Sequence, residues 1–594
     1  MFRKHRERHR SHQSYPPITQ GHAVTPSKSR RGSDNRSRRG KAKAGRTNAK
    51  RIDGRIRVLG VVALLSFAAL GVRATALAVA PGKLVSLAHQ EQQSEIALPA
   101  TRGEILDRNG APLAEDEQQQ TVFATPYMLS DPDTAAARLA TLLHIPQPPL
   151  LRALSDKKSG FAYVARQIAP SLAAKAVGLG LPGVASYPED KRIYPGKTLA
   201  TQILGLVGSD GQGLAGIEYA ENSKLSGKPG QETVITDPAG QALHTVSSSP
   251  AQPGQNVHLT IDEAIQLQTE QILASTVARY HALGATAIVE NPSTGEIYAM
   301  ANAPLVKASA FASHPALARN RAITDVYEPG STFKVVTIAA CLADGAVTPS
   351  TSFVLPPSIR VGGYVVHDAE ARPTERMTVT QILAKSSNVG VVTLAERYLG
   401  KDRLLQWTKR FGFGRPTGID FPGEAAGLLP TQWSASTIGN VPFGQGIAVT
   451  PIQMAAVYAA IANGGVWVRP HLTAQIGTQP VGSAKRRLIS PQVDKELTAM
   501  LSNVVADGTG TEAQIPGYAV AGKTGTAQKV LANGRGYSNT AFDASFVGFV
   551  PASHPQLCVL VMVDQPDVIY GGSVAAPAFR DIASFALQDL EIAP

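Results

Sequence analysis

The chain has few of the residues that build disulfide frameworks and metal sites. Only two cysteines, Cys341 and Cys558, occur in 594 residues, and each lies in an apolar run, which predicts small core residues rather than a redox pair. No Cys-x-x-Cys pair or His/Cys spacing typical of a metal site is present, and His281, His314 and His367 are scattered along the chain. We therefore expect no metal and no cofactor, and structural or surface roles for the histidines.

Basic charge is concentrated in one segment, and the rest of the chain has no basic excess. Residues 1–57 contain 18 of the 57 Lys and Arg residues and only three acidic residues, whereas residues 58–594 are slightly acidic. Residues 1–57 are also poor in large apolar side chains, which predicts a disordered basic tail. A basic tail can bind nucleic acid, but the segment that follows favours a membrane instead, so we expect no nucleic-acid partner.

Residues 58–80 are almost entirely apolar and long enough to cross a hydrocarbon core of ~30 Å. Their only charge, Arg73, lies near one end, where its side chain can snorkel to the headgroups. Three arginines at 51–57 precede the run, so the positive-inside rule places the N-terminus in the cytoplasm and everything after residue 80 outside it. Small residues at 76–80 leave a cleaved signal peptide as the alternative, but the leading region is too long for one, and we expect a retained transmembrane helix.

Residues 81–250 have a mixed α+β pattern and few clustered nucleophiles or bases. Asn109-Gly110 is typical of a hairpin turn between short strands. Residues 133–143 have the pattern of an amphipathic helix opened by an aspartate cap. The stretch 247–254, rich in Ser and Pro, is predicted to be a linker that closes this module. We interpret the module as a non-catalytic spacer.

The remaining residues predict an antiparallel sheet covered by helices, an α+β fold. A helix is expected after the capping residue Asp262, and another at 579–589. A turn at 291–295 is expected to join the two strands of the first hairpin. A glycine in the middle of 519–528 favours an edge strand there. Strands are expected at 256–261, 284–289, 296–300, 519–528, 544–551 and 557–563.

The tetrad Ser331-Thr332-Phe333-Lys334 has the spacing of a nucleophile and its base. A Pro-Gly turn precedes it and an apolar helix follows, which places Ser331 in the first helical turn. Residues three apart share a helical face, so the Lys334 amine could reach the Ser331 hydroxyl among unpaired N–H groups. Alone this is weak evidence, because Ser155-Asp156-Lys157-Lys158 also fits and is interpreted as a solvated turn. Glu328, just upstream, is interpreted as structural.

Two further motifs follow in order. Ser386-Ser387-Asn388 can point a hydroxyl and a carboxamide into one cleft from a bend. In Lys523-Thr524-Gly525-Thr526, Gly525 would let a ligand backbone lie close, and Lys523 would supply a cation for a carboxylate. Together S-x-x-K, S-x-N and K-T-G are the signature of penicillin-binding proteins and serine β-lactamases, and the three are far more specific than any one of them.

On these residues the chain resembles a class B penicillin-binding protein, a monofunctional peptidoglycan D,D-transpeptidase, most like the division-specific (septal) members. The resemblance covers about residues 58–594 and includes 102–110 and 190–195, which look like the family's pedestal or dimerisation module. It implies a penicillin-binding transpeptidase domain on an elongated α+β pedestal with one N-terminal transmembrane helix. The expected parts are a cytoplasmic tail (1–57), a transmembrane helix (58–80), a pedestal (81–250) and a transpeptidase domain (251–594).

The resemblance also implies the roles of the motif residues. Ser331 would attack the carbonyl between the two terminal D-alanines of a stem peptide, with Lys334 as base and Ser386 as proton relay. An amine of a neighbouring stem peptide would then resolve the acyl-enzyme. The backbone N–H groups of Ser331 and Thr526 would bind the oxyanion, and β-lactams would acylate Ser331. The substrate-binding residues would be Asn388, Lys523, Thr524, Gly525 and Thr526.

The implied partners are peptidoglycan stem peptides, lipid-linked precursor strands, β-lactams, a separate polytopic glycosyltransferase and division proteins, at the bacterial inner membrane. Four alternatives stay open. A β-lactamase or D,D-carboxypeptidase would deacylate with water, but the anchor, the pedestal-like region and the lack of a recognisable glutamate base argue against it. A β-lactam-sensing receptor fits poorly with one short membrane crossing and a basic tail without an enzymatic cytoplasmic domain. A bifunctional class A enzyme fits poorly because the space between residues 80 and 256 is hardly larger than a glycosyltransferase and has the pattern of a pedestal. A division scaffold without turnover is the fourth.

Overall fold

The computed structural model describes residues 48–79, 93–236, 242–311, 313–531, 534 and 536–594. Residues 1–47 of the predicted tail and residue 80 at the end of the predicted transmembrane helix lie outside the described residues. The chain divides into two units, Met1–Glu91 and Gln92–Pro594.

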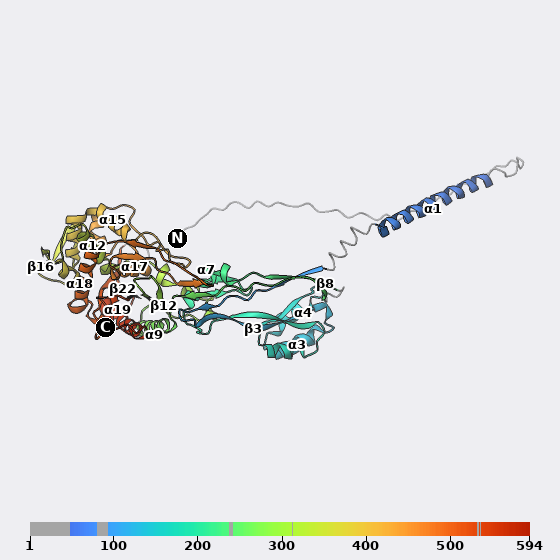
Figure 1. The fold of residues 1–594 in the computed structure, drawn as a ribbon, viewed down its shortest axis with the longest axis horizontal. Coiled ribbons are helices and arrows are strands. Elements are labelled where there is room, and N and C mark those ends of the chain that lie inside the picture. The colour runs from blue at the N-terminus through green and yellow to red at the C-terminus, as the bar shows by residue number, and fades with distance from the viewer. Residues whose placement is uncertain (1–47, 80–92, 237–241, 312, 532–533, 535) are drawn as a thin grey trace, which may run out of the picture. The chain divides into compact units, whose positions relative to one another are not determined.

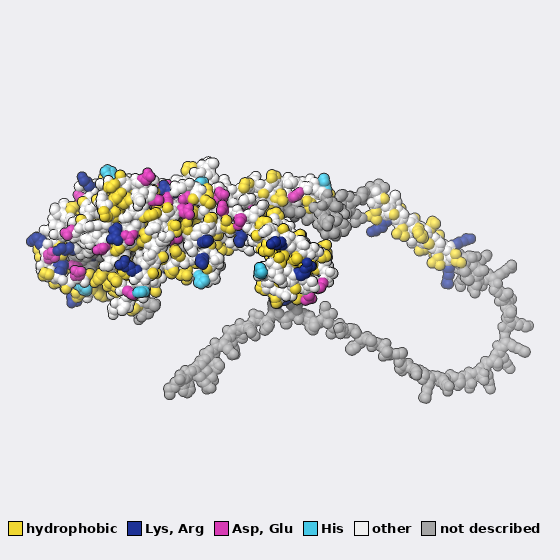
Figure 2. Space-filling model, turned by 90° about the horizontal axis from the view of Figure 1, so that it is seen from below, with side chains coloured by type: hydrophobic (Ala, Val, Ile, Leu, Met, Phe, Trp, Pro, Cys, Tyr) yellow, Lys and Arg dark blue, Asp and Glu magenta, His cyan; other side chains and the backbone are white. Residues whose placement is uncertain are grey.

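The first unit contains one long helix, α1 (Asn48–Val79). Its stretch Gly54–Ala78 is long and apolar enough to span a membrane, and its large apolar side chains, such as Leu64 and Phe67, are exposed (Figure 2). The helix starts at Asn48, so the disorder predicted for 48–57 is wrong. Lys and Arg are good helix formers, and a helix nucleated in the apolar run extends into them at little cost.

The second unit contains a five-stranded antiparallel sheet with helices on both faces (Figure 1). Val559, Val561 and Val563 pack toward helices α9 (Glu263–Arg279) and α19 (Gly571–Asp589), whereas Leu560 and Met562 pack toward the opposite side, with α17 (Pro451–Ala462). Both faces are buried, which explains the continuous apolar runs in these strands. The strand order is β12 (Ile297–Ala303), β11 (Gly284–Glu290), β23 (Leu557–Asp564), β22 (Tyr537–Val550), β21 (Ala521–Val530).

This sheet confirms the predicted α+β class, the first hairpin and the edge position of β21. The predicted cap is present, because an Asp262 carboxylate oxygen accepts from the N–H groups of Ala264 and Ile265. Helix α19 begins at Gly571 rather than at 579, with Pro577 inside it. Proline disfavours a helix interior, but the preceding turn is buried against the sheet, and that packing keeps it helical.

The predicted pedestal combines helices and a second sheet. Asn109-Gly110 forms the turn between β2 (Ile105–Leu106) and β3 (Pro112–Ala124), as predicted. The predicted amphipathic helix is α3 (Pro132–Leu143), capped by Asp131, which accepts from the Thr134 N–H at 3.1 Å. The sheet continues through β4 (Ala162–Ile168) and β5 (Val184–Ile193), which both pair with β3.

This second sheet crosses the predicted boundary between residues 250 and 251. Strand β10 (Val257–Leu259) pairs in parallel with β2 and antiparallel with β18 (Thr473–Ile476). Residues 247–249 belong to β9 (Ala242–Ser249), which pairs with β8 (Gly230–Thr236), so the linker prediction is wrong for them. Composition alone does not reveal a strand whose partner lies elsewhere in the chain.

A buried ion network joins the two pedestal segments that carried the family resemblance. The Glu218 carboxylate is fully buried and accepts from Nε of Arg102 and Nε of Arg192, each at 2.7 Å. Arg192 also pairs with Asp116 at 3.1 Å. Removing one partner of such a network leaves an uncompensated buried charge, so these residues fix segments 102–110 and 190–195 against each other.

Glu290, the last residue of β11, provides a test of pH-dependent stability. It is completely buried, and within the described part of the chain neither carboxyl oxygen has a hydrogen-bond partner. Burial raises the pKa of Glu290 to about 8, so the folded state favours the neutral acid and loses stability as the pH rises from about 4.5 to about 8. The substitution Glu290→Gln removes this ionisation. We expect the free energy of unfolding of the variant minus that of the native chain to increase by about 1.4 kcal/mol for each pH unit across this range.

The measurement is urea denaturation at a series of pH values. Glu512→Gln, which changes an exposed glutamate, is the matched control. Parallel pH dependences for Glu290→Gln and the native chain would contradict an ionisation of Glu290 in this range.

Candidate active site

Ser331 lies in a 3₁₀ turn, Gly330–Phe333, directly before helix α12 (Lys334–Ala343). Residues three apart are eclipsed in a 3₁₀ turn, which matches the spacing of Ser331 and Lys334. The turn is held from both sides: the Thr332 hydroxyl donates to the Pro329 carbonyl at 2.8 Å, and the buried Tyr458 hydroxyl donates to the Thr332 carbonyl at 2.9 Å. Ser331 stays partly exposed while Thr332, Phe333 and Lys334 are buried, so the fold presents the serine alone.

The Lys334 amine is fully buried and contacts the second motif. Its Nζ donates to Ser386 Oγ at 3.1 Å and to the Ser386 carbonyl. Burial lowers the pKa of Lys334 well below its usual value, and repulsion from Lys523 adds to this, while Asp368 opposes it. Among the described residues Ser331 and Lys334 form no hydrogen bond with each other. The amine is therefore suited to be a base, positioned by Ser386.

Ser386 lies between helices α13 (Val379–Ala384) and α14 (Asn388–Leu394) with a φ of 58°. A left-handed conformation is uncommon for serine and costs free energy, and here it turns Ser386 toward Lys334. Ser387 caps α14 by accepting from the Gly390 N–H at 2.9 Å. The Asn388 amide donates to the His367 carbonyl at 3.0 Å, so the carboxamide is partly engaged by the protein itself.

Asp368 supports the second motif and was missed by the sequence interpretation. Its carboxylate accepts from the Ser387 hydroxyl at 2.9 and 3.0 Å, from the Val389 N–H at 2.9 Å and from Arg372 Nε at 2.5 Å. It therefore fixes the start of α14 and places a negative charge near Lys334. A lone aspartate in a loop has no spacing relation to the motif, so no sequence pattern indicates it.

The third motif lies on the edge strand β21. Lys523 is fully buried, and its Nζ donates to the hydroxyls of Thr524 at 3.1 Å and Thr509 at 3.3 Å. Burial lowers the pKa of Lys523 to about 7. The Thr526 hydroxyl accepts from the Gly571 N–H, the first residue of α19, at 3.2 Å. Thr509 carries no motif signal and was not predicted.

Close packing within the protein requires a glycine at position 525. A Cβ at this position would lie 2.3 Å from Ser545 Oγ and 3.0 Å from the Pro329 carbonyl oxygen. The close neighbours within the protein are thus the adjacent strand and the turn that carries Ser331. A Cβ on Gly330 would likewise lie 2.9 Å from the Thr526 carbonyl oxygen, so β21 packs directly against the turn that carries Ser331.

Glu328 joins three segments around this turn. One carboxylate oxygen accepts from the Gly446 N–H at 2.9 Å and from the Tyr537 hydroxyl at 3.0 Å. Burial raises the pKa of Glu328 to about 7. These contacts are those of a positioning residue, in line with its structural interpretation.

The structure thus brings the three motifs to one place. Lys334 contacts Ser386, the charge of Lys523 acts on Lys334, and β21 lies against the Ser331 turn. Among the described residues no three His, Cys, Asp or Glu side chains are grouped to hold a metal ion. A partly exposed hydroxyl in the turn before a buried amine of depressed pKa can carry out nucleophilic acyl transfer.

Comparison with known proteins decides the family. Residues 285–584 match the penicillin binding protein transpeptidase domain, and residues 97–259 match the penicillin-binding protein dimerisation domain. The probable peptidoglycan D,D-transpeptidase PbpC of Pseudomonas aeruginosa is 36% identical over 509 residues, which cover 84% of this chain and 88% of that one. The chain belongs to the class B penicillin-binding proteins.

Other relatives of this class B penicillin-binding protein agree. The peptidoglycan D,D-transpeptidase FtsI of Escherichia coli is 34% identical over 528 residues, covering 87% of this chain and 88% of its own. The crystal structure of penicillin binding protein 3 from Mycobacterium tuberculosis in complex with aztreonam has a TM-score of 0.67 and 30% identity, covering 84% of this chain and 98% of that one. This class B penicillin-binding protein is a serine-type peptidoglycan D,D-transpeptidase, which confirms the activity predicted from the three motifs.

Asp368 gives a prediction for this penicillin-binding protein. In Asp368→Asn one carboxylate oxygen becomes an amide NH₂ group, which cannot accept a hydrogen bond. At least one of the contacts with Ser387, Val389 and Arg372 is therefore lost, at a side chain that is only 10% exposed. We expect acylation by penicillin to slow by about ten-fold, because the start of α14 is displaced. Acylation rates and thermal unfolding of the variant check this. Glu370→Gln, an exposed neighbour, is the control, and an unchanged acylation rate in Asp368→Asn would contradict a positioning role.

Proposed function

We propose that Ser331 is the nucleophile of a septal transpeptidase and that the three motifs divide the reaction among them. The observation that carries this proposal is the buried Lys334 amine, held by Ser386 at the base of the Ser331 turn. An amine of depressed pKa is neutral more often near pH 7, and only a neutral amine accepts a proton.

In the acylation step Ser331 Oγ attacks the carbonyl between the two terminal D-alanines of a stem peptide. The Ser331 proton passes to Lys334 and through Ser386 to the leaving nitrogen, the C–N bond breaks and D-alanine departs. The N–H groups of Ser331 and Thr526 bind the oxyanion, and each such donor contributes about 10²–10³-fold. The amine of a second stem peptide then attacks the ester carbonyl, the ester C–O bond breaks, and a proton of the amine passes through Lys334 to Ser331 Oγ, so that the cross-link forms and the free serine is restored.

The third motif and Asn388 bind the substrate in this proposal. The hydroxyls of Thr524 and Thr526 donate to the terminal carboxylate, and Gly525 keeps β21 close to the nucleophile turn. The Lys523 amine, which donates to the Thr524 hydroxyl, supplies positive charge that attracts the substrate carboxylate. It does so while it is protonated, below about pH 7. Asn388 holds the substrate amide.

Helix α1 supports the proposed location. We place it as a single pass through the bacterial inner membrane with a cytoplasmic N-terminus, since arginines precede its apolar stretch. Cross-linking needs strands that another activity has polymerised from lipid-linked precursors. A polytopic glycosyltransferase and division proteins are therefore the proposed partners.

The test is reaction of the purified full-length protein with penicillin, followed by peptide mapping by mass spectrometry. We expect a long-lived adduct on the peptide that contains Ser331. An adduct on another residue would contradict the assignment, and rapid loss of the adduct would favour the β-lactamase or carboxypeptidase alternative. For the septal role, depletion in cells is expected to give filaments, whereas rounded cells would indicate a role in elongation.

A further inference from the structure

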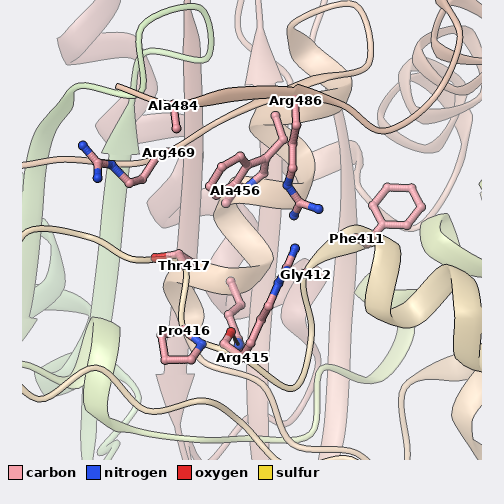
Figure 3. A pocket seen from close by; sticks show the side chains of 11 residues that line it. Phe411, Gly412, Arg415, Pro416, Thr417, Ala456, Arg469, Ala484 and Arg486 are labelled. Atoms are coloured by element: carbon pink, nitrogen blue, oxygen red, sulfur yellow. Dashed lines mark hydrogen bonds between the residues drawn. The ribbon is translucent and has the colours of Figure 1, made fainter. Parts of the chain in front are cut away.

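A cavity of about 330 Å³ opens in the transpeptidase part of the chain, and none of its lining residues belongs to the three motifs (Figure 3). Its walls come from the end of helix α15 (Gly400–Phe411), the loop after it, helix α17, strand β17 (Val466–Val468) and strand β20 (Lys485–Arg487). The proposed mechanism uses no residue of this cavity. Its lining contains three arginines, Arg415, Arg469 and Arg486.

The positive charge in this cavity is not compensated. Within the described residues none of the three arginines forms an ion pair, and no hydrogen bond engages the Arg415 guanidinium. Figure 3 shows Arg415 and Arg486 reaching toward each other from opposite walls. Burial lowers the pKa of Arg486, and repulsion from Arg415 and Arg410 adds to it. Two cations facing one another without an acid between them leave room for an anion.

Arg469, the third arginine of the lining, is engaged elsewhere. Its Nη2 donates to the Gly482 carbonyl at 3.0 Å. In Figure 3 its guanidinium points away from Arg415 and Arg486, so these two arginines form the candidate anion site.

The Arg486 guanidinium and the backbone of Arg415 are held in place before any ligand arrives. The Arg486 guanidinium lies 4.7 Å from the centre of the Trp467 ring, and its Nη1 donates to the Arg410 carbonyl at 2.9 Å. The guanidinium also lies close to Gly412, where a Cβ would be 3.1 Å from Arg486 Nη2. The Gln453 amide donates to the Arg415 carbonyl at 2.8 Å and so ties that loop to α17. Such preorganisation lowers the entropy cost of binding.

We propose that this cavity binds the carboxylate or phosphate group of a small ligand between Arg415 and Arg486, with Trp467 as an apolar wall. The planar guanidinium fork matches both groups in geometry and charge. Two sources share this chemistry. One is a peptide that ends in a carboxylate, as the substrate of this enzyme does, and the other is free phosphate.

The experiment is isothermal titration calorimetry on the full-length protein whose active site has been acylated with penicillin. The two probes are D-alanyl-D-alanine and inorganic phosphate. We expect saturable binding of at least one probe, which weakens as NaCl is added because the contacts are electrostatic. Tighter binding of the dipeptide identifies a peptide carboxylate as the ligand group, and tighter binding of phosphate identifies a phosphate.

Variants localise the binding. Arg415→Gln and Arg486→Gln are each expected to weaken it by about ten-fold, the loss of one charge-assisted contact. Arg279→Gln, at an exposed arginine on α9, is the matched control and should bind as the native chain does. Arg415 is exposed and its guanidinium has no partner among the described residues, so its replacement should leave the melting temperature unchanged. No saturable binding of either probe, or equal binding by the control and both pocket variants, would overturn the proposal.

Discussion

The Ser331→Ala variant is expected to form no covalent adduct with penicillin and to lose at least about 10⁴-fold in transpeptidation, because no other group can form the acyl-enzyme. The surrounding structure should survive the change. Ser331 is partly exposed, and the turn is held by the Thr332 hydroxyl and by Tyr458 rather than by the Ser331 side chain. The measurements are the mass of the protein after exposure to penicillin and the rate of cross-link formation.

Ser155→Ala is the matched control for this prediction. Ser155 belongs to the other S-x-x-K tetrad, and it is exposed at the end of helix α4 (Gln147–Ser155). It should acylate at the native rate. Growth and septation in cells that carry only Ser331→Ala would show instead that the protein serves as a scaffold, whereas failure to divide supports an essential transpeptidase.

Lys334→Arg is expected to reduce acylation by about 10²–10⁴-fold, although the positive charge is kept. A guanidinium does not lose its proton in a protein, so the variant has no base. Arginine is also larger than the buried site that holds the lysine amine against Ser386. Thermal unfolding therefore accompanies the rate measurement, and Lys334→Gln, a smaller neutral replacement, should be impaired to a similar degree.

The pH profile of native acylation follows from the two lysines. The rate rises with pH as Lys334 loses its proton and becomes a base, at a pH well below that of a free amine. The rate falls again as Lys523 loses the charge that attracts the substrate carboxylate, near pH 7. The two lysines interact, so the rising and falling parts of the profile give apparent pKa values of the pair and not of either lysine alone. A chromogenic β-lactam measures this profile, and a rate that climbs steadily to pH 10 would contradict a Lys334 of depressed pKa.

Local patterns in the sequence predicted the local structure well. The apolar run of α1, the aspartate that caps α9, the hairpin of β11 and β12 and the edge strand β21 each depend on residues close together in the chain. The disorder predicted for 48–57 was wrong for a local reason, the extension of α1 into these residues, but two other errors arose where distant residues decide. Residues 247–249 form a strand only because β8 lies beside them, and the early start of α19 depends on burial against the sheet.

The sequence by itself determined the chemistry of this protein: two serines, two lysines and an asparagine in three motifs, following one segment apolar enough for a membrane. Only the tertiary structure decided how these groups act. It places the Lys334 amine on Ser386, supports that motif with Asp368, and sets Gly525 against the nucleophile turn. It also gathers Arg415, Arg469 and Arg486 around a cavity. The reason is that the spacing within a motif depends on residues close together in the chain. The burial of a side chain, its pKa and the distance between two motifs depend instead on which segments pack together, and these segments lie tens or hundreds of residues apart.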